Sequence, residues 1–110
     1  MDRIEGYQKL IRAAVHGAFN QEAQDFYFTA MAEVYGRVKM RTGYELVPDG
    51  TDSILIYQHG ELLGGYYFKE ETPAMYIILV ELDPNNPEKS VPMFIDKAVE
   101  AVLELIKKNV

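Results

Sequence analysis

The chain has 110 residues, of which 48% are hydrophobic, 25% charged and 12% aromatic, and it contains no cysteine. This length predicts a single globular domain over residues 1–110, and the composition is that of a folded chain rather than a disordered or fibrous one. The lack of cysteine excludes a disulfide scaffold, a thiolate zinc site and a cysteine nucleophile. Seventeen acidic and eleven basic side chains give a net charge of −6, which argues against nucleic acid as a partner.

No segment of the sequence resembles a targeting signal or a membrane span. The first five residues mix charges and have no apolar core behind them, unlike a secretory signal. The longest apolar run covers only residues 75–80, whereas a helix needs about 20 apolar residues to cross a bilayer. We therefore expect a cytoplasmic protein with no membrane partner.

A first helix is predicted over residues 3–17. Asp2 and Glu5 have the spacing of a capping box, which marks a helix start. Behind them, apolar side chains recur at intervals of three and four, as they do on one face of a helix. These are Ile4, Tyr7, Leu10, Ile11, Ala14, Val15 and Ala18.

A second helix is predicted over residues 21–41, with Asn20 as its N-cap and Gly43 as its C-terminal stop. The apolar residues between Phe26 and Val34 also alternate, so a partly stranded segment is the alternative. Helix propensity and length favour the helix.

Three strands are predicted next, over residues 53–58, 61–69 and 75–82, because β-branched and aromatic residues dominate there. A turn at residues 48–52 would precede the first strand, and the pair His59-Gly60 and the segment Glu70–Pro73 would separate the three strands. Together these segments predict an antiparallel meander.

The last predicted element is a helix over residues 91–108, with Ser90 as its cap and Pro92 in its first turn. The element order is then α-α-β-β-β-α. The expected fold class is α+β, with a three-stranded antiparallel meander packed against helices.

The faces of the predicted sheet indicate an oligomer. A two-residue turn at His59-Gly60 would pair residue 57 with 62 and residue 55 with 64. Both faces of the hairpin would then be apolar, one carrying Leu55, Tyr57, Leu62, Tyr66 and Phe68 and the other Ile54, Ile56, Leu63 and Tyr67. A short chain has few helices with which to cover two faces, so we expect a homo-oligomer, most simply a dimer. The alternative is a complete monomer whose helices divide between the two faces.

Acidic residues concentrate in the predicted meander. Residues 45–88 hold nine acids and one base, a net charge of −8, while both flanking segments are slightly basic. Glu70, Glu71 and Asp83 are therefore candidates for an interaction surface that docks a basic partner. Solvated turns that resist aggregation are the alternative interpretation.

Arg37, Lys39 and Arg41 form the one basic cluster. They could bind a phosphate-bearing ligand, or they could meet the acidic residues of another subunit. Basic side chains in a last helical turn are also favoured by the helix dipole without any ligand.

A pocket is predicted near Gly64 and Gly65, with Tyr66 and Tyr76 beside them. Two glycines within a strand of large residues allow a ligand to approach the backbone closely, and tyrosines can stack on it. A β-bulge with no ligand explains the same glycines.

No motif for catalysis, cofactor binding or metal binding occurs in the sequence. His16 and His59 have no partners at metal-ligand spacing, apart from the weak pair His59 and Glu61. Ser53 and Ser90 are not in a nucleophile-elbow context. The sequence thus nominates no catalytic residue, no cofactor and no metal, and leans away from an enzyme.

Residues 54–108 resemble the centre of a GNAT-type N-acetyltransferase. The hairpin Ile-Leu-Ile-Tyr-Gln-His-Gly-Glu-Leu-Leu-Gly-Gly-Tyr is similar to a strand pair of that family, and residues 75–84 to its cofactor strand with a Asp-Pro exit. The resemblance implies acyl transfer from coenzyme A. The family's glycine-rich pyrophosphate loop corresponds to residues 86–92. This segment contains two prolines and lacks glycine, so no functional residue of the family carries over.

The sequence therefore predicts a small non-enzymatic protein–protein interaction or regulatory domain that self-associates and binds an unknown protein partner. The alternative is a domain for small-ligand binding or GNAT-like acyl transfer with its pocket near Gly64-Gly65.

Overall fold

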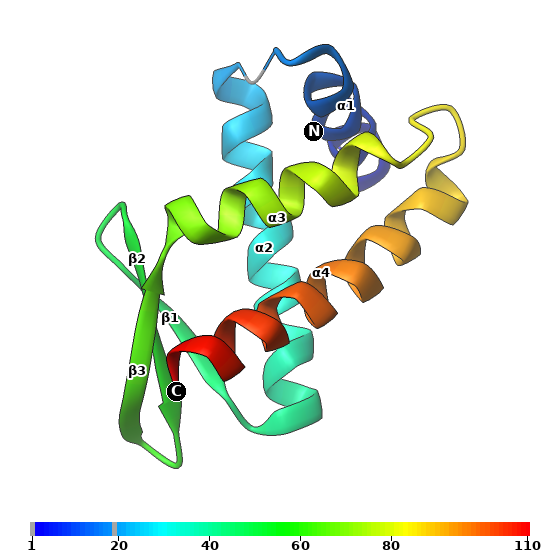
Figure 1. The fold of residues 1–110 in the computed structure, drawn as a ribbon. Coiled ribbons are helices and arrows are strands. Elements are labelled where there is room, and N and C mark those ends of the chain that lie inside the picture. Colours follow the sequence, from blue (N-terminus) through cyan, green and yellow to red (C-terminus); the bar gives the residue numbers. More distant parts are fainter. Residues whose placement is uncertain (1, 19) are drawn as a thin grey trace.

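The computed structural model describes residues 2–18 and 20–110, and it confirms the α+β class with a three-stranded antiparallel meander (Figure 1). Four helices are described, one more than predicted. In chain order the elements are α1 (Arg3–His16), α2 (Gln21–Thr42), β1 (Glu45–Asp49), β2 (Ser53–Gln58), β3 (Glu61–Tyr67), α3 (Phe68–Val80) and α4 (Pro87–Asn109).

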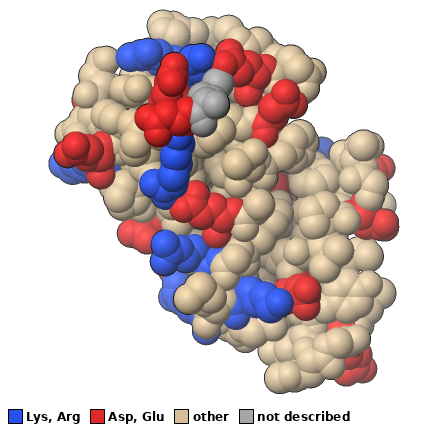
Figure 2. Space-filling view, turned by 180° about the vertical axis from the view of Figure 1, so that it is seen from behind, with Lys and Arg blue, Asp and Glu red and all other residues tan. Residues whose placement is uncertain are grey.

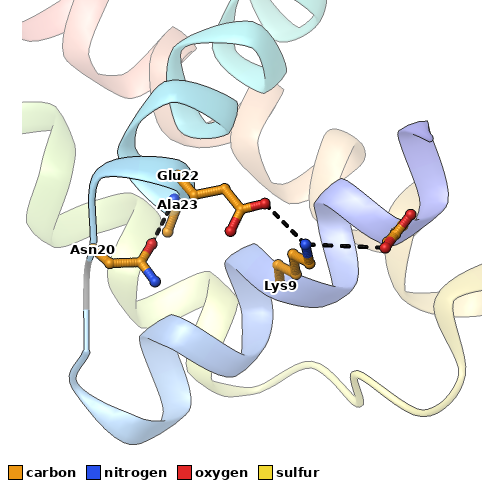
Figure 3. A network of polar contacts seen from close by, with 5 residues as sticks. Lys9, Asn20, Glu22 and Ala23 are labelled. Atoms are coloured by element: carbon orange, nitrogen blue, oxygen red, sulfur yellow. Dashed lines mark hydrogen bonds and ion pairs between the residues drawn. The ribbon is translucent and has the colours of Figure 1, made fainter. Parts of the chain in front are cut away.

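The first two helices are confirmed within one residue of their predicted ends. Asn20 caps α2, because its side chain accepts a hydrogen bond from the backbone N–H of Ala23 at 2.8 Å (Figure 3). Lys9 of α1 pairs with Glu22 at the start of α2 at 2.8 Å, an exposed ion pair between the two helices. Asp2 is the N-cap of α1 but makes no capping bond with its side chain, so the predicted capping box does not form.

The sheet has the order β1-β2-β3, with β2 in the centre. The predicted turn between β2 and β3 is confirmed. His59 and Gly60 both have positive φ, 53° and 78°, as the tight hairpin turns that suit twisted strands require.

The predicted register of this hairpin is wrong beyond its first two pairs. Tyr57 pairs with Leu62, but Ile56 pairs with Gly64, so Leu63 is an extra residue in β3. This bulge moves Tyr66 opposite Ile54 and turns it into the core, whereas Tyr67 points to the other face. One inserted residue thus exchanges the faces of β3.

The predicted strand over residues 75–82 is wrong, because this segment lies within and just after helix α3. The predicted turn at residues 70–73 is wrong as well, since these residues form the early turns of the same helix. A short apolar run does not distinguish a buried strand from a buried helix. Here the buried residues Glu71, Met75, Ile78 and Leu79 are three or four apart, so the structure buries one helical face.

The third strand is instead β1, which was predicted to be partly turn. Its sequence Glu-Leu-Val-Pro-Asp is rich in residues that strands disfavour. Pro48 is tolerated because β1 is an edge strand. The turn itself is shorter than predicted and covers residues 50–52.

Helix α4 begins four residues earlier than predicted, with Asn86 at the N-cap and Pro87 at the first helical position. Ser90 is therefore not the cap. Its buried hydroxyl donates to the backbone carbonyl of Asp83 at 2.7 Å and fastens the loop between α3 and α4 to the helix.

All four helices lie on one side of the sheet (Figure 1). The core forms between them and the inner face of the sheet, which contributes Leu46, Ile54, Ile56 and Tyr66. The C-terminal end of α4 crosses β3 at Gly64. The helices do not divide between the two faces, so the outer face of the sheet is left open.

Substitutions at two glycines, one at the contact between α4 and β3 and one away from it, test this packing. A methyl group at Gly64 would collide with the backbone carbonyl of Asn109, so Gly64→Ala should lower the free energy of unfolding by about 1–3 kcal/mol. Gly36 lies within α2 with open space at its Cβ position, so Gly36→Ala should raise it by about 0.5–1 kcal/mol. Urea unfolding measures both changes, and equal effects at the two sites would contradict the packing of α4 on β3.

Candidate functional site

The side chain of Glu71 lies fully buried in the core, with 0% of its surface exposed. It enters from the first turn of α3 and accepts three hydrogen bonds from phenols. Tyr35 donates to Oε1 at 2.6 Å, Tyr66 donates to Oε1 at 2.9 Å and Tyr27 donates to Oε2 at 3.1 Å. This buried carboxylate cluster joins α2, β3 and α3 at one point.

Burial and hydrogen bonding act on this cluster in opposite directions. Burial raises the pKa of Glu71, and the three tyrosine hydroxyls lower it, with a net rise. Burial and the neighbouring carboxylate raise the pKa of all three tyrosines, which keeps them protonated as donors. The cluster is sealed inside the protein, so its chemistry serves the fold.

Glu71 therefore does not belong to the predicted interaction surface, and that prediction is wrong. The sequence pattern places Glu71 among the acidic turn residues, because residues 70–73 resemble a turn. Had α3 been recognised, the spacing from Glu71 to Met75 and Ile78 would have placed it on the buried face.

A second carboxylate links α1 and α2. Glu33 accepts a hydrogen bond from Arg3 at 2.7 Å and another from the Tyr7 hydroxyl at 2.9 Å. Partial burial raises the pKa of Glu33, but the hydrogen bonds from Arg3 and Tyr7 outweigh it and lower the pKa overall. This contact is partly exposed and holds the N-terminal helix in place.

The three side chains of the predicted basic cluster lie on two different sides of α2. Arg37 and Arg41 line a cavity of about 680 Å³ between α2 and α4, where Arg41 pairs with Glu100 at 2.5 Å. Lys39 lies toward β1, where it pairs with Glu45 at 3.7 Å. Figure 2 shows basic and acidic side chains interleaved on this side of the molecule rather than gathered into separate areas.

The remaining acidic candidates lie apart from one another. Glu70 is half-buried in the first turn of α3, with Oε2 buried and without a hydrogen-bond partner. Asp83 is exposed in the loop after α3, where its carboxylate accepts from the backbone of Asn85 at 2.9 Å. The structure does not bring these two residues together as one docking surface.

The structure does not form the predicted pocket near Gly64-Gly65. The space beside Gly64 is filled by the carbonyl of Asn109, and that beside Gly65 by the carbonyl of Ile54. The hydroxyl of Tyr66 donates a hydrogen bond to Glu71 in the core, while Tyr76 is exposed on α3. The glycines accompany a bulge, as the alternative interpretation held.

The resemblance to an acetyltransferase is not matched by the fold, because residues 75–80 form a helix where that family has its cofactor strand.

The outer face of the sheet is open and carries an apolar patch, beside the exposed acids Glu45 and Asp49 that share this face by register. Leu62 is 55% exposed, Tyr67 52% and Val47 38%, and the half-buried Leu55 and Tyr57 lie between them. We call these five residues the open sheet face. The ammonium of Lys69 lies 5.1 Å from the centre of the Tyr67 ring, at one end of this face.

A second apolar surface is a groove of about 690 Å³ between α2 and β1. We call it the α2–β1 groove. Its walls are Phe28, Met31, Ala32, Tyr35, Gly36 and Lys39 of α2, Glu45, Leu46 and Pro48 of β1, Gly50 and Thr51 of the following turn, and Phe68 of α3. Sequence patterns did not reveal it, because it depends on β1 and on the start of α3.

Within residues 2–18 and 20–110, no three His, Asp or Glu side chains gather as they would around a metal ion. No helix of this described part is long and apolar enough to cross a membrane. The chain matches no protein-family model, no curated protein and no solved structure.

The buried carboxylate cluster predicts a pH dependence of stability. Because the pKa of Glu71 is raised on folding, the folded state holds this proton more tightly than the unfolded chain does. Its contribution to the free energy of unfolding is therefore greatest below the unfolded pKa and declines as pH rises through the folded pKa. Glu71→Gln removes this titration. The free energy of unfolding of the wild type minus that of Glu71→Gln should then fall as the pH rises above the ordinary glutamate value of 4.5.

Urea unfolding at several pH values measures this difference. Glu104→Gln is the matched control for the loss of one carboxylate, since Glu104 is exposed on α4. A difference that grows with pH would mean that the tyrosines stabilise the carboxylate more than burial opposes it.

Proposed function

We propose that this chain is a small non-enzymatic protein–protein interaction domain that self-associates through its open sheet face. The observation that carries the proposal is the exposure of apolar side chains where an antiparallel sheet ordinarily presents polar ones to water. Val47, Leu55, Tyr57, Leu62 and Tyr67 alternate outward on three adjoining strands, so they form one continuous surface.

The charges around this face are mixed. Glu45 lies opposite Tyr57 and Asp49 opposite Ser53, so by register both exposed acids share this face, and Lys69 lies at the end near Tyr67. The support for a second copy is therefore the apolar surface itself.

The position of Glu71, an acid whose pKa is raised, supports a role in binding rather than catalysis. Glu71 has its pKa raised by burial, and such groups are ordinary candidates for catalysis when they line a cleft. This one has no exposed surface and holds three elements together. The accessible features described above are instead two apolar surfaces and the cavity between α2 and α4.

The solution mass tests the proposal. At micromolar concentration the wild type should sediment at twice the chain mass of 12.6 kDa. Leu62→Glu places a charge within the proposed contact and should give a monomer. Ile77→Glu is the matched control, because Ile77 is 61% exposed on α3 and away from the sheet, and it should leave the dimer intact.

A wild type that is monomeric at these concentrations would contradict the proposal. A dimer that survives Leu62→Glu but is lost in Ile77→Glu would place the contact on α3 instead.

A further inference from the structure

The outward positions of the sheet form a grid of three rows across the three strands. The strand order places β1 at one edge, β2 in the middle and β3 at the other edge. A two-fold axis that brings two such faces together therefore decides which strands and which rows meet. By register the rows are Glu45–Tyr57–Leu62, Val47–Leu55–Gly65 and Asp49–Ser53–Tyr67.

The third row carries two charges of opposite sign, one at each edge of the sheet. Asp49 is exposed on β1, and the exposed Lys69 holds its ammonium over the ring of Tyr67 on β3. Within the described part of the chain, neither Asp49 nor Lys69 has an ion-pair partner. Glu45, the other acid of this face, pairs with Lys39 at 3.7 Å. Asp49 and Lys69 are thus the two charges of this face that a second copy has to meet.

A two-fold axis along β2 satisfies both charges. It places β1 of each copy over β3 of the other, and every row then faces its own row. Asp49 meets Lys69 of the other copy, and the symmetry makes this contact twice in the dimer. Glu45 then faces Leu62, but its charge is already held by Lys39.

The other face-to-face arrangements leave the two charges unmatched. With the axis across the strands, the third row faces the first, so Asp49 meets Glu45 and Lys69 meets Leu62. With the sheets crossed at right angles, Asp49 faces either Leu62 or Asp49 of the other copy. Each of these contacts removes water from a charge without supplying a partner, which costs free energy.

The shape of the middle row favours the same axis. Gly65 leaves a depression in the face, and a larger residue is excluded there because its Cβ would lie 2.7 Å from the carbonyl oxygen of Ile54. With the axis along β2, Val47 of the other copy lies over this depression, and Leu55 meets Leu55 on the axis. With the axis across the strands, Gly65 would face Gly65 and leave a void, whereas packed interfaces have few voids.

We propose that two copies meet with their two-fold axis along β2, so that Asp49 of each copy pairs with Lys69 of the other. This pairing rests on the proposed function, since it specifies how the open sheet face receives a second copy. Facing sheets lie about 10 Å apart, a gap that the long, flexible lysine side chain can bridge. The helices of both copies, which lie on the inner sides of their sheets, stay clear of the contact (Figure 1).

A zero-length cross-link tests the pairing in the wild-type chain. A carbodiimide activates a carboxylate, and a lysine amine that touches it then forms an amide with it. An equal mixture of nitrogen-15-labelled and unlabelled chains is treated, digested and read by mass spectrometry. An amide between Asp49 and Lys69 should join a labelled to an unlabelled chain. Finding it only within single chains, not at all, or replaced by a link from Lys69 to Glu45 of the other copy would overturn the arrangement.

Charge reversal measures the same contact in solution. At low ionic strength, Asp49→Lys and Lys69→Asp should each weaken the dimer about tenfold, because each opposes like charges at two symmetry-related sites. The double variant, Asp49→Lys with Lys69→Asp, should return the dissociation constant to within about twofold of the wild type. Sedimentation gives these constants. A double variant that shows no recovery would overturn the pairing.

Two control variants separate the contact from net charge. Glu61→Lys changes the charge as Asp49→Lys does, but Glu61 lies opposite Gln58, whose side chain is on the other face of the sheet. Lys108→Asp on α4 is the control for Lys69→Asp. Both controls should change the dissociation constant less than twofold, in line with exposed charges outside the contact. Losses equal to those of the Asp49 and Lys69 variants would overturn the pairing.

Failure of this pairing can be told apart from failure of the proposed function. A monomeric wild type, or a dimer that survives Leu62→Glu, would contradict both. A dimer that Leu62→Glu abolishes, but that shows neither the cross-link nor the recovery, would keep the open sheet face as the contact and overturn only the axis along β2.

Discussion

The fold depends on how the carboxylate of Glu71 is accommodated in the core. A buried carboxylate costs several kcal/mol unless it is hydrogen-bonded. Here three phenols solvate it, and they come from α2 and β3 while Glu71 itself comes from α3. Leaving any of these elements out would leave polar atoms without partners in the core. The requirement therefore sets α2 and α3 against the same face of the sheet.

The open sheet face results from this placement of the helices on one side of the sheet. Because α2, α3 and α4 all gather on the side to which Tyr66 points, the opposite side receives no helix. The bulge at Leu63 decides which residue faces which way: it directs Tyr66 to the carboxylate and Tyr67 to water. Core formation and the exposed apolar surface are thus linked through one inserted residue. The same cluster shapes the α2–β1 groove, since it draws the hydroxyl of Tyr35 inward.

Sequence patterns predicted the parts of the fold that local rules govern. The caps at Asn20 and Gly43, the helical spacing in α1 and the His59-Gly60 turn all act over a few residues, and all were confirmed. Helix α3 was missed because its short apolar run suits a buried strand equally well. The buried carboxylate cluster was not predicted for a different reason. Tyr27 and Tyr35 are 44 and 36 residues from Glu71, so only the tertiary fold unites them.

The central claim is that the open sheet face is the surface by which two copies meet. It is tested most directly by isotope-edited NMR on a mixture of carbon-13-labelled and unlabelled chains, in which only contacts between copies give cross-peaks. The account predicts intermolecular NOEs from the side chains of Val47, Leu62 and Tyr67. NOEs confined to the exposed side of α3, or their absence at millimolar concentration, would contradict it.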